Sequence, residues 1–243
     1  MKVIIPSKGR SDIIGDRTLR LFPDATVCVG DDEVDDYSKV TQRLLVHPAN
    51  VMGTGPLRNW IMDNVDDPCV VMVDDDMKRM YSQVGFHKRA IEDPATIQAI
   101  VERLAIVAAD AGIRVFGFNQ CSTPMSYSNC KPFSVNTWVS GLVGIIGREL
   151  RYDESLLLRA DIDFCLQSFI RDRIVLCDGR YVCQFGLFAG KGGNSILRSK
   201  ERHERETAYL KRKWGKYLDV VNAKDTTRIV LHVERTGRGS AKR

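Results

Sequence analysis

The chain has 243 residues, enough for one sizeable hydrophobic core, and its 44% apolar and 28% charged residues are typical of a globular protein. No apolar run approaches the roughly 20 residues of a membrane helix, and Met1–Pro6 is too short for a signal peptide. We therefore expect a cytoplasmic protein. Seven cysteines without a Cys-x-x-Cys pair indicate neither a disulfide framework nor a zinc knuckle.

The net charge of +5 is unevenly distributed along the chain. Residues 189–243 contain 15 basic and 6 acidic residues, whereas residues 1–188 contain 21 basic and 25 acidic ones. This asymmetry favours a basic C-terminal region that faces a polyanion, although a solvated helix face and a basic tail explain it equally well. We expect residues 236–243 to form a disordered basic tail.

The first half of the chain alternates short β-rich runs with helical patterns, which predicts α/β layers around a mostly parallel sheet. The expected strands are residues 2–5, 26–30, 43–47, 69–73 and 114–118. Helices are expected at 11–21, at 56–64 and from Pro94 to a stop at Gly112.

The second half predicts fewer elements. Residues 134–147 favour one or two strands, and residues 161–172 favour a helix. Residues 173–185 predict a hairpin that turns at Asp178-Gly179, and residues 199–217 predict a basic helical extension. Since no repeat or linker is visible, we expect one domain over residues 1–235.

Three adjacent carboxylates, Asp74-Asp75-Asp76, follow the apolar strand 69–73. They repel one another, and a divalent cation that also bridges to substrate phosphates compensates such a cluster well. Ligands of open α/β sheets bind at the carboxyl ends of strands, where this triplet is predicted. The sequence therefore predicts a divalent-metal site at this triplet, with a non-functional acidic turn as the alternative.

Polar segments also follow the first two strands, at the same predicted edge. In Pro6-Ser7-Lys8-Gly9-Arg10 the glycine permits a tight turn, while Lys8 and Arg10 can meet phosphate charge. Asp31-Asp32 ends the second strand, where a carboxylate can accept hydrogen bonds from a base or a ribose. An ordinary polar loop and a solvated turn explain these segments equally well.

Two glycine-rich segments suit an anionic ligand. Residues 53–59 open the helix that precedes the triplet, and Arg58 adds a fixed positive charge there. This segment is not a P-loop, because no Gly-Lys-Ser/Thr follows. Residues 188–195 include Lys191 and are a candidate lid over a diphosphate.

A second acidic cluster precedes and opens the helix at 161–172. A group transfer to a hydroxyl needs a base, and Asp161 and Asp163 are candidates, although either can equally be an ordinary N-cap. His203 follows on a charged helix. A solvated side chain is its commoner role, and metal ligation is the alternative.

The order of these segments resembles the GT-A-fold glycosyltransferases of the family-2 type. The shared features are a first strand ending in Pro-Ser, an acidic second strand end, an Arg-Asn helix start, an Asp-x-Asp strand end and a later Asp-x-Asp-Phe helix. The resemblance implies that Pro6 and Ser7 lie against a nucleotide base and that Asp32 lies near the uridine.

For the sugar side, the same resemblance implies that Arg58 supports the diphosphate and that Asp74 and Asp76 bind ribose and metal, leaving Asp75 less defined within the nucleotide site. The family's later helix begins with Glu-Asp, whose Asp is the base in inverting enzymes. Here Ala160 replaces the Glu and Asp161 matches the Asp, so Asp161 and Asp163 both stay candidates.

More narrowly, Val3–Arg10, the aspartate triplet and Arg159–Phe164 resemble the TET-associated glycosyltransferases, phage-encoded relatives of the base J glucosyltransferase. This resemblance implies inverting transfer of a hexose from a UDP-sugar to 5-hydroxymethylcytosine or 5-hydroxymethyluracil in DNA, inside an infected bacterium. It divides the domain into a nucleotide-sugar half (about 1–120) and an acceptor half (about 121–235). The basic C-terminal region agrees, because duplex phosphates demand Lys and Arg.

Three alternatives remain open from the sequence. The same fold can act on a glycan, lipid or protein acceptor, and a non-catalytic DNA-binding module explains the basic region. A nucleotidyltransferase also needs paired carboxylates, but its long glycine-rich signature does not fit the short Ser7–Arg10 segment. The oligomeric state is not predicted.

Overall fold

The computed structural model describes residues 1–84, 87–120, 127, 130–186, 199–223 and 226–232. Lys191 and the predicted tail at 236–243 lie outside these residues. None of the helices in the described part of the chain has the length and apolar character needed to cross a membrane.

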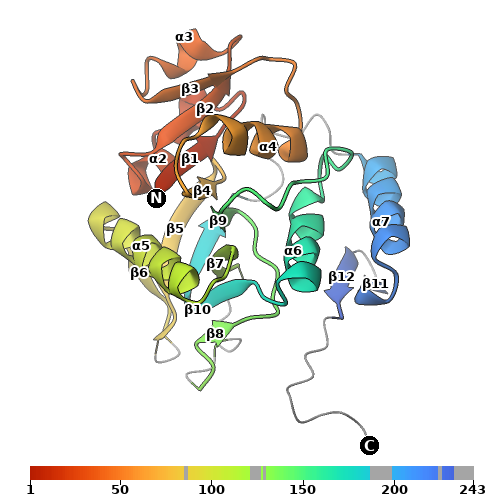
Figure 1. Cartoon of the computed structure of the whole chain (residues 1–243). Helices are drawn as coiled ribbons and strands as arrows, with labels where there is room; N and C mark the ends of the chain where they lie inside the picture. Colours follow the sequence, from red (N-terminus) through yellow and green to blue (C-terminus); the bar gives the residue numbers. More distant parts are fainter. Residues whose placement is uncertain (85–86, 121–126, 128–129, 187–198, 224–225, 233–243) are drawn as a thin grey trace, which may run out of the picture.

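A ten-stranded mixed sheet runs through the molecule (Figure 1). Its order is β3-β2-β1-β4-β9-β7-β10-β5-β6, with β8 paired to β10. The parallel block expected from the sequence consists of β3 (Leu44–His47), β2 (Thr26–Gly30), β1 (Lys2–Pro6) and β4 (Cys69–Val73). Antiparallel pairing begins at β9 (Leu142–Ile146), next to β4. The remaining strands are β5 (Met77–Ser82), β6 (Arg89–Ile91), β7 (Val115–Asn119), β8 (Phe133–Ser134) and β10 (Leu176–Phe185).

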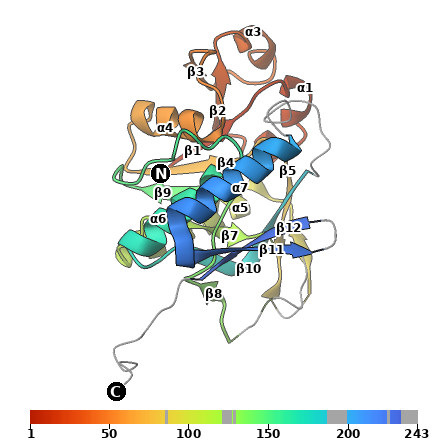
Figure 2. The ribbon, with the colours of Figure 1, turned by 90° about the vertical axis from the view of Figure 1, so that its right-hand side faces the viewer.

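Helices cover both faces of the sheet, as Figure 1 shows. One face carries α1 (Ser11–Ile14), α2 (Thr18–Leu21), α3 (Val34–Tyr37) and α5 (Pro94–Asp110). The other face carries α4 (Thr54–Asn64), α6 (Ala160–Arg171) and α7 (Lys200–Trp214). A short 3-10 turn (Gly215–Tyr217) then leads into the separate hairpin of β11 (Leu218–Ala223) and β12 (Thr226–Leu231), which lies beside α7 (Figure 2).

The central strands are apolar on both sides because helices cover both faces of the sheet. In β1, Ile5 packs in the core beneath α5, whereas Ile4 packs in the core beneath α4 and α6. In β4, Val71 and Met72 divide in the same way, and both are fully buried. This buried block holds the carboxyl ends of β1 and β4 side by side.

Several predicted elements are confirmed, and two are wrong. The expected helix at 11–21 is divided into α1 and α2, and the expected hairpin at 173–185 is the single strand β10. Asp178-Gly179 does not turn the chain, because Gly179 N–H donates to the Pro132 carbonyl (2.8 Å) and the strand shifts register here instead. The four strands β5, β6, β11 and β12 were not predicted.

Candidate nucleotide and acceptor site

The polar segments that follow β1, β2 and β4 meet at one edge of the sheet, as their parallel order requires. Pro6 ends β1 in register with Cys28 of β2. Gly9, at φ 63°, donates its N–H to the Glu33 carboxylate (2.8 Å), which joins the β1 loop to the turn containing Asp32. Asp32 is exposed in that turn and Lys8 is half-buried.

Asp75, the middle residue of the triplet, braces this edge from within. It is 5% exposed, and its Oδ2 accepts the Ser7 hydroxyl at 2.6 Å. Its Oδ1 pairs with the Arg10 guanidinium. Burial raises the pKa of Asp75, while Arg10 and Ser7 oppose that rise. Asp75 therefore connects β4 to the β1 loop and has no oxygen aimed away from protein partners.

Asp74 is fixed through its backbone and its side chain. Its N–H donates to the Gly141 carbonyl (2.7 Å), and its carbonyl accepts the Thr18 hydroxyl (2.6 Å). Its carboxylate receives the Arg58 guanidinium at 3.0 Å and stays substantially exposed. Asp74 thus presents a charged group to solvent from a rigid backbone.

Asp76 is the carboxylate of the triplet with the fewest compensating contacts. The Arg10 guanidinium lies 3.6 Å from Oδ2, and the Gly186 N–H donates to the Asp76 carbonyl (3.0 Å). Burial, followed by the charges of Asp74 and Asp75, raises the pKa of Asp76 to about 6. A carboxylate held in this state fits a divalent cation, which would relieve the same repulsion.

Arg58 links the triplet to the acceptor half. It is buried in α4, and its guanidinium lies 3.0 Å from Asp74 and 3.4 Å from the Tyr152 hydroxyl. The Tyr152 ring stacks on Phe164 with a centroid separation of 4.0 Å. Asn59 exchanges hydrogen bonds of 2.9 Å with the Tyr152 backbone. The Arg-Asn pair therefore fixes both the Asp74 carboxylate and the start of the loop that leads to α6.

The two candidate bases occupy different environments. Asp161 is half-buried at the start of α6; burial raises its pKa, the nearby Arg58 charge opposes that rise, and Asp74 adds to it. Asp163 is fully buried, and its oxygens receive Trp214 Nε1 (2.8 Å), Lys213 Nζ (2.8 Å) and Gln167 Nε2 (2.7 Å). These bonds tie α6 to α7 and favour Asp161 as the base.

The sequence hypotheses for His203 and Lys191 stay predictions. His203 is half-buried in the first turn of α7, and Lys191 lies outside the described residues. The described residues contain no group of three or more His, Cys, Asp and Glu side chains arranged to hold a metal. The segment that contains Lys191 follows Gly186, which contacts Asp76.

Three residues at this site were missed by sequence reasoning. Tyr37 accepts the Arg10 N–H (3.0 Å) and lies 2.6 Å from the Ser7 hydroxyl, while Thr18 braces Asp74. Neither shows a local signal, because the partners are far apart in sequence. Glu206 does show one: it is a charged residue on the face of α7 that carries the buried Leu210.

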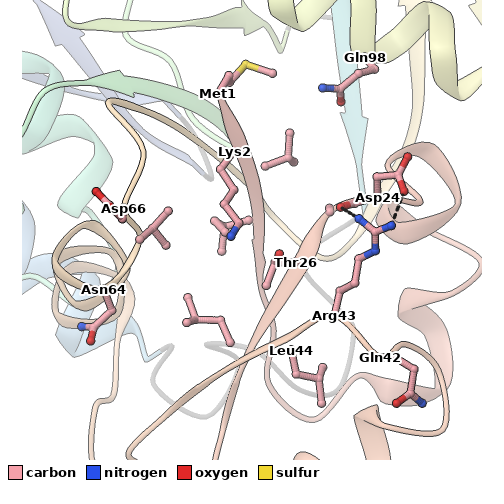
Figure 3. A pocket seen from close by; sticks show the side chains of 15 residues that line it. Met1, Lys2, Asp24, Thr26, Gln42, Arg43, Leu44, Asn64, Asp66 and Gln98 are labelled. Carbon is pink, nitrogen blue, oxygen red and sulfur yellow. Dashed lines mark hydrogen bonds and ion pairs between the residues drawn. The ribbon is translucent and has the colours of Figure 1, made fainter.

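One groove of the described structure lies elsewhere. A groove of about 610 Å³ opens at the amino ends of β1, β2 and β3, with Lys2, Thr26 and Leu44 on its wall (Figure 3). Within it, Arg43 pairs with Asp24 at 2.9 Å. The groove shares no residue with the triplet edge, so it does not serve the site described above.

Comparison with known proteins identifies one family. A family model described as TET-Associated Glycosyltransferase matches residues 1–177. No curated protein matches the chain.

Solved structures of similar fold include two from Staphylococcus aureus and one from Mycobacterium tuberculosis. S. aureus TarS 1–349 is 14% identical, with a TM-score of 0.47 over 76% of this chain and 60% of that one. The complex of TarS 1–349 with UDP-GlcNAc is 12% identical, with a TM-score of 0.49 over 87% of this chain and 67% of that one. The third structure is glucosyl-3-phosphoglycerate synthase from M. tuberculosis in complex with Mn2+, UDP and phosphoglyceric acid. It is 13% identical, with a TM-score of 0.49 over 96% of this chain and 86% of that one. The functional assignment rests on the family match.

Proposed function

Because the chain belongs to the TET-associated glycosyltransferase family and is therefore a glycosyltransferase, we propose that it transfers a hexose from a UDP-sugar to the hydroxymethyl group of a modified pyrimidine in DNA. The observation that carries this proposal is the convergence of Asp74, Asp76, Arg58 and Asp161 at one edge of the sheet. Arg58 contacts Asp74 directly, and its charge also acts on Asp161. The donor and acceptor halves thus meet at one arginine.

On the donor side, Ser7, Lys8, Arg10 and Asp32 line the nucleotide end of this edge, with Lys191 as a further candidate. Asp74 and Asp76 would hold manganese or magnesium, whose chemistry is to neutralise the charge of the departing diphosphate. The elevated pKa of Asp76 supports this assignment, because a nearby cation stabilises the ionised form.

On the acceptor side, Asp161 takes the proton from the acceptor hydroxyl. The hydroxyl oxygen then bonds to the anomeric carbon as the bond from that carbon to the diphosphate oxygen breaks, which inverts the configuration and releases UDP. Burial raises the pKa of Asp161, and the positive charge of Arg58 opposes that rise, which favours the ionised form that a base needs. His203 remains the candidate third metal ligand.

The DNA acceptor is proposed from the family and from charge. The last turn of α7, within the proposed acceptor half, carries Lys211, Arg212 and Lys213, of which Lys213 pairs with Asp153 and Asp163. Basic side chains of this kind bind duplex phosphates by releasing counterions. With DNA as the proposed acceptor, the proposed place of the reaction is the cytoplasm of an infected bacterial cell.

The test is a transfer assay followed by mass spectrometry of the nucleosides. Purified protein is incubated with Mn2+, a panel of UDP-hexoses and duplexes that contain 5-hydroxymethylcytosine, 5-hydroxymethyluracil or unmodified bases. We expect one hexose mass to be added to a hydroxymethylated nucleoside only. If no DNA gains a hexose while a glycan, lipid or peptide does, the DNA proposal is wrong and the alternative acceptor class is supported.

A further inference from the structure

A buried carboxylate of α7 binds the backbone immediately before the proposed base. Glu206 is 3% exposed. Its Oε1 accepts the Leu157 N–H at 3.2 Å, and its Oε2 accepts the N–H groups of Leu158 and Arg159 at 3.1 Å each. Asp161 follows two residues later, in the first turn of α6. A buried charge with three backbone donors fixes these three peptide groups, because releasing any donor would leave it unsatisfied.

The loop between Tyr152 and Asp161 is anchored separately at each end. Asn59 of α4 holds the start through its two hydrogen bonds to the Tyr152 backbone. Glu206 holds the end, immediately before α6. The Tyr152 backbone is therefore held by α4, whereas the 157–159 backbone before Asp161 is held by Glu206 of α7.

α7 is itself fixed to α6. Trp214 Nε1 donates to the Asp163 carboxylate at 2.8 Å, and Lys213 Nζ bridges Asp163 (2.8 Å) and Asp153 (2.6 Å). These contacts lie two turns beyond Glu206 on the same helix. Glu206 is thus presented by a helix that is fixed to α6 through contacts outside the 157–159 segment that it binds.

We propose that Glu206 is a positioning residue for the base Asp161: it fixes the 157–159 backbone so that the carboxylate of Asp161 reaches the acceptor hydroxyl. This inference rests on the proposed function. Displacing a catalytic group by about 1 Å can cost about a hundredfold in rate, so three lost backbone contacts are enough to matter. The donor contacts of Arg58 and Asp74 do not involve Glu206, so the loss falls on the chemical step rather than on donor binding.

The test compares Glu206→Gln and Glu206→Ala with Glu204→Gln, a control that changes an exposed glutamate of the same helix. Hydrogen exchange is measured for the 157–159 amides, and kcat and the donor KM are measured in the transfer reaction. We expect exchange about tenfold faster or more, kcat about tenfold lower in Glu206→Gln and lower still in Glu206→Ala, and donor KM within about threefold. Glu204→Gln should match the wild type.

Folded Glu206→Gln protein with wild-type kcat overturns the proposal. Faster exchange also overturns it if the donor KM rises by the same factor as kcat falls, because donor binding would then be affected as much as the chemical step. If Glu206→Ala does not fold, the isosteric Glu206→Gln and the shorter Glu206→Asp carry the test. Hydrolysis of the UDP-sugar, with water as acceptor, is measured in parallel. Wild-type protein that hydrolyses the donor but modifies no DNA defeats the proposed function alone, while hydrolysis and exchange still decide the role of Glu206.

Discussion

The three aspartates of the triplet make three different contributions. Asp75 is buried between Ser7 and Arg10, Asp74 is exposed beside Arg58, and Asp76 lies between these conditions. Position along the strand decides this: consecutive side chains leave the strand end in different directions. The division gives Asp75 a structural role and leaves Asp74 and Asp76 as the proposed ligand contacts.

Replacing Asp75 should therefore cost stability. In Asp75→Asn, the Arg10 guanidinium loses its closest carboxylate and Ser7 loses a charged acceptor, so we expect about 2 kcal/mol less free energy of unfolding. Urea unfolding measures this loss. Asp66→Asn, in the exposed loop before β4, is the matched control and should be neutral. Equal unfolding midpoints for the two variants would contradict the bracing role.

Replacing Asp76 should instead stabilise the metal-free protein at neutral pH. Burial and the neighbouring carboxylates raise its folded pKa to about 6, against about 4 in an unfolded chain. Between these values the folded state binds the proton more tightly, so the free energy of unfolding rises as the pH falls from 7 to 5. We expect wild type to gain on the order of 1 kcal/mol relative to Asp76→Asn over this range in EDTA. Parallel pH profiles would show that the Asp76 pKa is not raised.

At the scale of elements, the sequence predicted what short-range patterns determine. β2 and β4 have the expected bounds, because uninterrupted apolar runs end at charged residues. Contacts with other segments explain the failures. Asp178-Gly179 resembles a hairpin turn, but the Pro132 carbonyl accepts the Gly179 N–H and the Arg180 guanidinium pairs with the Asp178 carboxylate. Likewise, the aspartate triplet was predicted, whereas its brace Thr18 lies 56 residues from Asp74.

The start of α4 packs closely against the loop between Tyr152 and Asp161. A Cβ on Gly55 would lie 2.7 Å from the Asp153 carbonyl oxygen, and backbone at this distance cannot move aside cheaply. Gly55→Ala should therefore lower the free energy of unfolding by about 1–3 kcal/mol and also reduce transfer. Gly15→Ala is the control: Gly15 has φ −60° and an added Cβ meets Val40 at an ordinary 3.6 Å, so we expect a neutral or slightly stabilising effect.

Denaturant unfolding and transfer assays on both glycine variants check this prediction. A Gly55→Ala protein as stable and active as Gly15→Ala would show that α4 and the loop between Tyr152 and Asp161 are not tightly packed.

At the scale of the whole molecule, the nucleotide edge and the basic helix belong to different layers. The triplet lies at the sheet edge, and α7 packs outside α6 (Figure 2). Asp161, the base that we propose, lies in the first turn of α6. The uneven charge seen in the sequence corresponds to basic residues in the last turn of α7, in a different layer from the triplet.

DNA binding should follow this separation. We expect the affinity for a hydroxymethylated duplex to fall at least tenfold from 50 to 200 mM salt, and the Lys211→Ala, Lys216→Ala double variant to bind more weakly with a shallower salt dependence. Both lysines are exposed at the end of α7, whereas Lys39, the control position, follows α3. Fluorescence anisotropy measures the affinities. A double variant indistinguishable from Lys39→Ala would exclude this end of α7 as a DNA surface.

We propose that Asp74 and Asp76 form a metal-assisted UDP-sugar site, and calorimetric titration with UDP measures this. Titrations are made with Mn2+ and with EDTA, for wild type, Asp76→Ala and the exposed control Asp110→Asn. The account predicts UDP binding by wild type and Asp110→Asn only when Mn2+ is present, and its loss in Asp76→Ala. Metal-independent UDP binding that Asp76→Ala retains in full would contradict it.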